Sequence, residues 1–361
     1  MSLDLGTWTI VSLVAGLLVT IPSIMGLFGK NKFDVKGKAR HRTHPLLDSL
    51  ADYQQTVLLT GASEGMGRSV AIQLSKKGAN IIIVARNVGK LEEALGVVRA
   101  AAANPSSQRF HYISADLAEE NESGRVIVEA IAWNNGTAPD VVWCIAGSAY
   151  PSIFLETPRA IKRQQMDINY WSCADMAQAI LSEWLAPGAV MGGAPKHLVF
   201  TSSVAAFYPI AGYASYGPAK AAIRCLSDSL AQELLLYGDA VKIHTVFPGT
   251  IDSPGLVNEN KVKPDITHIL EESDSGFSPD AMAAGSIKGL ENGEYLITVG
   301  FLGQIMRAAC WGCSPRNNWV WDTFLSWIIA IVWYFVPMDM DSKVRAYGKK
   351  HGHPSTYPKK V

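Results

Sequence analysis

A regular alternation of short apolar runs with helical stretches limits the folds open to this chain more than any other feature. The strand-like runs are Gln55–Thr60, Ile81–Val84, Phe110–Ser114, Val141–Cys144, Leu198–Phe200 and Ile243–Phe247. The helical stretches between them are Gly67–Lys77, Val88–Ala101, Ala118–Trp133, Pro158–Trp184 and Ala214–Tyr237. Such alternation predicts an α/β fold with a doubly wound parallel sheet. Ligands of such sheets bind at the carboxyl ends of the strands.

Composition excludes some classes of function. The formal net charge is zero, so no basic surface indicates nucleic acid as a partner. The five cysteines are scattered and form no disulfide framework, which indicates a reducing, cytosol-facing compartment. Cys310 and Cys313 form a lone CxxC pair, with no second pair at zinc spacing. No metal is therefore expected, and the roles of these two cysteines stay open.

The N-terminal segment predicts a membrane anchor. Thr7–Gly29 carries no charge and is just long enough to span a bilayer. Basic residues follow it: Lys30, Lys32, Lys36, Lys38, Arg40 and Arg42. Because basic flanks stay cytoplasmic, the main body is expected in the cytosol, with residues 1–29 as a transmembrane helix. A cleaved signal peptide would carry its charge before the apolar run. Residues 30–52 form a basic linker, which either rests on acidic lipid or is a solvated tether.

A second apolar region follows the catalytic domain that we expect at residues 53–292. Tyr295–Cys313 is apolar except for Arg307 near its middle, and Thr323–Met338 is uncharged and rich in tryptophan. The second stretch is too short for an easy span, and its aromatics suit a membrane interface. Residues 293–338 are interpreted as a membrane-associating region, and residues 339–361 as a cytosolic tail. A helix packed on the domain or across a dimer is the alternative, and a homo-oligomer is possible.

A glycine-rich turn joins the first strand to the first helix. Its sequence is Thr-Gly-Ala-Ser-Glu-Gly-Met-Gly over residues 60–67. Glycines there permit a tight turn and close approach of the backbone to a pyrophosphate at a helix N-terminus. The turn therefore predicts a Rossmann-type dinucleotide site. The residues expected to contact the cofactor in this turn are Gly61, Ser63, Gly65, Met66 and Gly67.

The end of the second strand selects the cofactor. Arg86 stands where an NAD enzyme usually has an acidic residue, and with Ser63 it favours the 2′-phosphate of NADPH. A solvated surface arginine is the alternative. Asp116, just after the third strand, suits either the adenine amine or the N-cap of the next helix.

Three side chains after the fifth strand predict proton transfer to a carbonyl oxygen. Ser203 lies where the strand ends, and Tyr216 and Lys220 project from one face of a helix because they are four residues apart. A free tyrosine has a pKa of about 10, and a nearby cation stabilises its phenolate. Tyr213 is not followed by a lysine at this spacing, and Ser202 would point to the opposite face of the strand.

These motifs together resemble the short-chain dehydrogenase/reductase family over Gln55 to about Asn292. The resemblance implies Tyr216 as general acid/base, Lys220 on the nicotinamide ribose and Ser203 on the substrate oxygen. Asn169 would complete the tetrad and hold a relay water. Ala146-Gly147 would abut the cofactor, as would Pro248-Gly249, Ile251 and Ser253. One departure is Cys144-Ile145, where the family often has two asparagines that tie strands together, so local bracing is in doubt.

The loop from Thr250 to Pro264 resembles that of 3-ketodihydrosphingosine reductases, which also have an N-terminal membrane segment. That resemblance implies NADPH-dependent reduction of a long-chain lipid ketone, 3-ketodihydrosphingosine, to dihydrosphingosine. It also implies residence in the endoplasmic reticulum membrane, with the catalytic domain facing the cytosol. A microsomal steroid or retinoid reductase is the alternative within the family. A non-catalytic NADPH-binding membrane scaffold is the alternative of another class.

Overall fold

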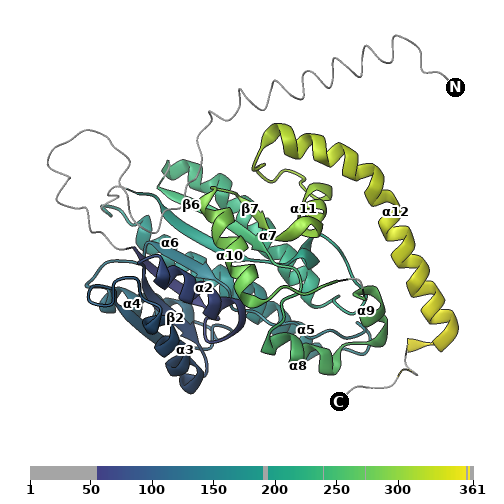
Figure 1. The fold of residues 1–361 in the computed structure, drawn as a ribbon, viewed down its shortest axis with the longest axis horizontal. Helices are drawn as coiled ribbons and strands as arrows, with labels where there is room; N and C mark the ends of the chain where they lie inside the picture. The colour runs from purple at the N-terminus through teal and green to yellow at the C-terminus, as the bar shows by residue number, and fades with distance from the viewer. Residues whose placement is uncertain (1–54, 190–193, 239, 273, 355–356, 358–361) are drawn as a thin grey trace, which may run out of the picture.

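A seven-stranded parallel sheet forms the centre of the molecule (Figure 1). The computed structural model describes residues 55–189, 194–238, 240–272, 274–354 and 357. The strand order is β3-β2-β1-β4-β5-β6-β7, and every neighbouring pair is parallel. The strands are β1 (Thr56–Thr60), β2 (Asn80–Ala85), β3 (Phe110–Ser114), β4 (Val141–Cys144), β5 (Lys196–Thr201), β6 (Val241–Phe247) and β7 (Leu296–Thr298). The chain order reverses between β1 and β4, so the predicted doubly wound sheet is confirmed.

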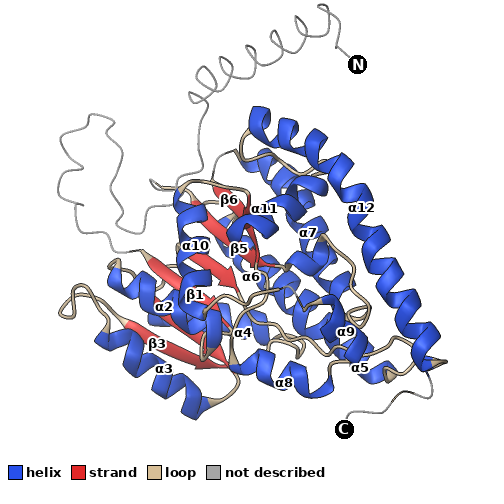
Figure 2. Ribbon diagram, turned by 45° about the vertical axis from the view of Figure 1, so that its right-hand side comes forward, coloured by secondary structure: helices blue, strands red, loops and turns tan. Residues whose placement is uncertain are grey.

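Helices cover both faces of this sheet (Figure 2). Alternate side chains of each strand point to opposite faces, which explains the uninterrupted apolar runs. On one face, Leu58 and Ile82 belong to a core with residues of α4, α6 and α7. On the other, Leu59 and Ile83 pack with α2, α3 and α10. The α-helices are α2 (Gly65–Lys76), α3 (Val88–Ala100), α4 (Glu122–Trp133), α5 (Arg159–Met166), α6 (Ser172–Trp184), α7 (Tyr216–Glu233), α8 (Pro254–Val262), α9 (Asp265–Leu270), α10 (Pro279–Glu291), α11 (Gly300–Ala309) and α12 (Trp319–His351).

The structure departs from the predicted elements in several places, among them the helix before β5 and the last strand. The stretch expected as one helix from Pro158 to Trp184 contains a π-helical turn, η2 (Asp167–Trp171), between α5 and α6. The last strand, β7, lies beyond the predicted alternation and has only three residues, too few to give an apolar period.

The C-terminal region forms α12, a single helix of 33 residues that packs against α11 and α9. It runs through residue 338, where the apolar stretch was expected to give way to a tail. Among the residues that the structure describes, no helix combines the length and apolarity needed to cross a bilayer. The predicted anchor (1–29) and linker (30–52) lie outside the described residues.

Thr60 braces the strand ends at the position where the family's asparagines are missing. Its Oγ1 accepts hydrogen bonds from the backbone N–H of Ile145 at 2.9 Å and of Ala146 at 3.1 Å. Thr60 is buried at 1% exposure, so both donors would lack this partner without its hydroxyl. The bracing between β1 and β4 is therefore supplied from β1.

We expect Thr60→Val to lower the free energy of unfolding by about 1–3 kcal/mol, because it removes the acceptor of buried N–H groups. Chemical denaturation of the full chain measures this change. Thr137→Val is a matched control, since Thr137 is exposed. Equal stability of the two variants would contradict the bracing role of Thr60.

Candidate active site

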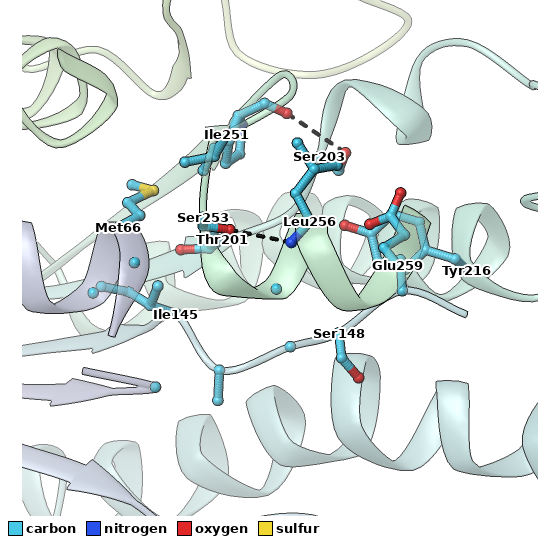
Figure 3. Close-up of a pocket in the computed structure, with 18 of the residues that line it drawn as sticks. Met66, Ile145, Ser148, Thr201, Ser203, Tyr216, Ile251, Ser253, Leu256 and Glu259 are labelled. Carbon is cyan, nitrogen blue, oxygen red and sulfur yellow. Dashed lines mark hydrogen bonds between the residues drawn. The ribbon is translucent and has the colours of Figure 1, made fainter. Parts of the chain in front are cut away.

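The carboxyl ends of β1, β4, β5 and β6 open onto a cavity of about 680 Å³. Its size suits a dinucleotide together with part of a substrate. The lining includes every cofactor residue that the sequence predicted: Gly61, Ser63, Gly65, Met66, Gly67, Arg86, Asp116, Ala146, Gly147, Tyr216, Lys220, Pro248, Gly249, Ile251 and Ser253. Figure 3 shows Met66 and Ile145 at one end of the cavity and Tyr216 and Glu259 at the other.

The glycine-rich turn has the geometry that a pyrophosphate requires. Gly61 has φ +62°, and a Cβ there would lie 2.7 Å from the Cα of Ala146. A Cβ on Gly67 would lie 2.3 Å from the carbonyl oxygen of Gly61. The N-cap residue of α2, Glu64, makes no capping hydrogen bond with its side chain, so the first N–H groups of the helix lack that partner at the edge of the cavity. These features fit a dinucleotide.

Two cations line the far end of the cavity, where the ribose and adenine of a dinucleotide would lie. The Arg86 guanidinium lies 3.6 Å from Asp116, and its side chain is 68% exposed. Lys90, in the first turn of α3, contacts Glu64 at 2.7 Å. Lys90 is not among the cofactor residues predicted from the sequence. Its position in the sequence, four residues after Arg86, is a pattern that could have indicated a second cation at this end of the cavity.

Asp116 does not cap the helix that follows it. Its Oδ1 accepts from the backbone N–H of Ala118, whereas α4 begins only at Glu122. The N-cap alternative for Asp116 is therefore wrong. Its carboxylate lines the cavity beside Arg86.

Tyr216, Ser203 and Lys220 meet where β5 ends. Tyr216 is the first residue of α7, and it lines the cavity with Ser203, close enough for the Ser203 hydroxyl to act on the phenol. Lys220 lies one turn along α7, with its Nζ 5.6 Å from the centre of the Tyr216 ring. The same Nζ donates to the backbone carbonyl of Thr201 at 3.0 Å. The hydroxyls of Ser203 and Tyr216, next to the buried ammonium of Lys220, can bind a carbonyl oxygen and donate a proton to it.

Burial shifts the pKa of both ionisable groups. It raises the pKa of Tyr216, the hydrogen bond with Ser203 opposes that rise, and the charge of Glu259 adds to it. The phenol is therefore protonated near neutrality, which suits a proton donor. Burial lowers the pKa of Lys220 to about 8, while the thiols of Cys173 and Cys144 oppose the change.

The two alternative side chains have other partners. Ser202 Oγ donates to the backbone carbonyl of Lys220 at 2.7 Å, so it joins β5 to α7. The Tyr213 hydroxyl donates to Glu259, and Tyr213 is 8% exposed. Because Ser202 and Tyr213 bind these other partners, neither is a better candidate than Ser203 or Tyr216 to contact a carbonyl oxygen.

Asn169 lies on the π-helical turn and is fully buried. Its Nδ2 donates to the carbonyls of Ser148 and Gln165 at 2.8 and 2.9 Å, and its Oδ1 accepts from Ser148 N–H. A Cβ on Gly147 would lie 2.7 Å from Asn169 Oδ1 and 3.0 Å from Lys220 Nζ. Asn169 therefore stands behind Gly147 next to Lys220. Its role with a relay water stays a prediction.

The loop after β6 closes the same end of the cavity. Ser203 Oγ donates to the carbonyl of Pro248 at 3.5 Å, and Ser253 Oγ accepts from Leu256 N–H, capping α8 (Figure 3). Ile251 forms a bridge to Phe277. The predicted Pro-Gly loop thus contacts Ser203 and begins α8.

Comparison with known proteins agrees with this geometry. The family model for short chain dehydrogenases matches residues 55–263, which span the glycine turn, Ser203, Tyr216 and Lys220. The chain belongs to the short-chain dehydrogenase family. The family resemblance seen in the motifs is thus confirmed.

Two relatives match this short-chain dehydrogenase over nearly its whole length. The 3-ketodihydrosphingosine reductase gsl-3 of Neurospora crassa is 50% identical, over 98% of this chain and 94% of that protein. The 3-ketodihydrosphingosine reductase ksrA of Aspergillus fumigatus is 45% identical, over 96% and 94%.

Among solved structures, a short-chain dehydrogenase from Sphingobium yanoikuyae in complex with NADPH has a TM-score of 0.58 and 20% identity. The match covers 71% of this chain and 91% of that one. At this identity the likeness shows the shared fold.

The buried ammonium of Lys220 predicts a pH effect on the stability of this dehydrogenase. Its folded pKa of about 8 lies below the ordinary 10.5, so between these values the unfolded chain binds a proton that the folded chain does not. The free energy of unfolding of wild type, relative to Lys220→Met, should therefore rise by about 3 kcal/mol from pH 8 to pH 10.5. Denaturation across this range measures the difference. A difference that stays constant with pH would contradict it.

Proposed function

We propose that the protein reduces 3-ketodihydrosphingosine to dihydrosphingosine with NADPH. The observation that carries the proposal is 50% identity, over nearly the whole chain, to a protein named 3-ketodihydrosphingosine reductase. The grouping of Ser203, Tyr216 and Lys220 in one cavity supports it, because those side chains suit reduction of a ketone. Arg86 and Lys90 support NADPH, since a 2′-phosphate at the ribose end can replace Asp116 and Glu64 as the partner of these cations.

The chain's own residues position the carbonyl and supply the proton. Bound NADPH supplies the hydride. Ser203 and Tyr216 hold the ketone oxygen through their hydroxyls, and Tyr216 donates its proton to that oxygen. The ammonium of Lys220 stabilises the phenolate left on Tyr216, because opposite charges favour each other strongly in a buried site. Thr201, through its carbonyl, keeps that ammonium in place.

An apolar part of the cavity supports a long-chain substrate. Its lining includes Ile210, Leu256, Val262 and Met306, beside Tyr216. Met306 belongs to α11, so the cavity reaches the helix next to α12. An alkyl chain can lie there, with its ketone at Tyr216.

We further propose that the outer surface of α11 and α12 rests on lipid, at the endoplasmic reticulum, with the catalytic domain in the cytosol. Large apolar side chains are exposed there: Phe301, Leu302, Trp319, Trp321, Trp327 and Ile328. Tryptophan favours the boundary between headgroups and acyl chains. The uncharged N-terminal segment would add a second anchor. This arrangement would bring a lipid ketone to the cavity beside α11.

A substrate panel tests the reaction. Purified protein with NADPH should oxidise the cofactor with 3-ketodihydrosphingosine and not with steroid or retinoid ketones. Tyr216→Phe should lower turnover by about 100- to 10,000-fold and leave NADPH binding nearly unchanged, because it loses only the proton donor. Turnover of steroids alone would favour the alternative reductase. Cofactor binding with no turnover of any ketone would favour the scaffold.

Arg86→Ala tests the choice of cofactor. Loss of the guanidinium should raise the Michaelis constant for NADPH by about 10- to 100-fold, while that for NADH stays within about threefold. Steady-state kinetics with both cofactors provides the measurement. Arg68→Ala is the matched control, since Arg68 pairs with Glu93 outside the cavity lining. An equal response to both cofactors would leave Arg86 as surface charge.

Vesicle flotation tests the membrane surface. In a chain lacking residues 1–29, replacing Trp319, Trp321 and Trp327 by alanine should remove most of the remaining binding to lipid vesicles. The matched control replaces exposed Val97 and Val128 by serine, on α3 and α4, which lie on the other side of the molecule from α12 (Figure 1). Undiminished flotation of the tryptophan variant would contradict a lipid-resting role for α12.

A further inference from the structure

One group of charged side chains in the cavity has no part in the reaction described so far. Glu259, on α8, and Glu271, just after α9, both line the cavity. Lys263 lies between them, with its Nζ 3.1 Å from Glu259 and 2.7 Å from Glu271. Two carboxylates thus share one ammonium, which leaves an excess of one negative charge. Because a partly buried negative charge is unfavourable without an opposite charge, this excess negative charge favours a cationic ligand in the cavity.

The contacts of Glu259 leave one of its oxygens available. Tyr213 and Lys263 both bind its Oε1. Its Oε2 receives no hydrogen bond from the residues that the structure describes. The side chain is 17% exposed and its residue lines the cavity, so Oε2 is open to a ligand there. Lys263 and Tyr213 hold the carboxylate in a fixed position.

Glu259 is also close enough to Tyr216 for its charge to act on the phenol. Figure 3 shows these two side chains next to each other, with Ser203 nearby. A carbonyl oxygen held by Tyr216 and Ser203 would therefore place its neighbouring carbon within reach of Glu259. A cation on that carbon would meet the unpartnered oxygen.

We propose that Glu259 binds the protonated amine of the substrate and selects α-amino ketones over neutral ketones. The inference rests on the proposed function, since the substrate named there carries an amino group on the carbon next to its ketone. A carboxylate and an ammonium form a charge-assisted hydrogen bond, which is stronger than a neutral one. A steroid or retinoid ketone has no such cation. Glu259 is a specificity-determining residue that touches the substrate without taking part in proton transfer.

The test compares 3-ketodihydrosphingosine with 1-hydroxyoctadecan-3-one, which has the same chain, hydroxyl and ketone but no amine. Wild type should prefer the amino ketone by about 10- to 100-fold in kcat/KM, because only that ketone offers the charge-assisted bond. Glu259→Gln keeps an oxygen acceptor for Tyr213 and removes the charge. It should lose most of this preference, because KM for the amino ketone should rise by much more than any change in KM for the neutral ketone.

Glu272→Gln is the matched control, because Glu272 is exposed, stands next to Glu271 and lies outside the cavity lining. It should keep the wild-type preference. NADPH binding by Glu259→Gln shows whether that variant is folded. The comparison of the two ketones with wild-type protein tests the inference even if the variant does not fold.

Three outcomes would overturn the inference. Wild type that reduces both ketones equally well would overturn it and leave the ketone reductase intact. An equal loss on both ketones in Glu259→Gln would assign Glu259 to holding Tyr213 and Lys263. Wild type that reduces neither ketone with NADPH would contradict the proposed function itself, and with it this inference.

Discussion

The active site depends on one buried ammonium group. Lys220 is only 3% exposed, and a cation in such a place needs polar partners. The carbonyl of Thr201, at the end of β5, supplies one. Ser202 fixes the backbone of Lys220 to the same strand end, so α7 begins where Tyr216 can meet Ser203. The position of Tyr216, the proposed proton donor, therefore follows from how the Lys220 ammonium is held.

The neighbouring elements are shaped around this cation. The backbone passes it at Gly147, where a Cβ would force the side chains of Lys220 and Asn169 to shift. Asn169 reaches that place because the helix widens into a π-helical turn, a distortion often found at functional sites. Thr60 then ties the strand that leads to Gly147 to β1. Gly147, the π-helical turn and the hydrogen bonds to Thr60 together bring the backbone after β4 close to the Lys220 ammonium.

Much of this arrangement could be predicted from the sequence, because it depends on local patterns. Buried parallel strands show as apolar runs, and the spacing of Tyr216 and Lys220 places both on one helix face. The π-helical turn could not be predicted, because its residues suit a regular helix equally well. The roles of Thr60 and Glu259 depend on partners far away in the chain, Ile145 in one case and Tyr213 in the other. A single sequence carries no signal for such pairs.

The charges of the cavity match the two ends of the proposed reaction. Arg86 and Lys90, paired with Asp116 and Glu64, lie at the ribose end, where a phosphate can take the place of those carboxylates. Glu259 lies near Tyr216, which suits an amine. The most direct test of the central claim uses NADPH with both hydrogens at carbon 4 of the nicotinamide replaced by deuterium, and 3-ketodihydrosphingosine as substrate. Mass spectrometry of the product should find one deuterium, on the carbon that carries the new hydroxyl. Dihydrosphingosine without deuterium, or no dihydrosphingosine at all, would contradict the account.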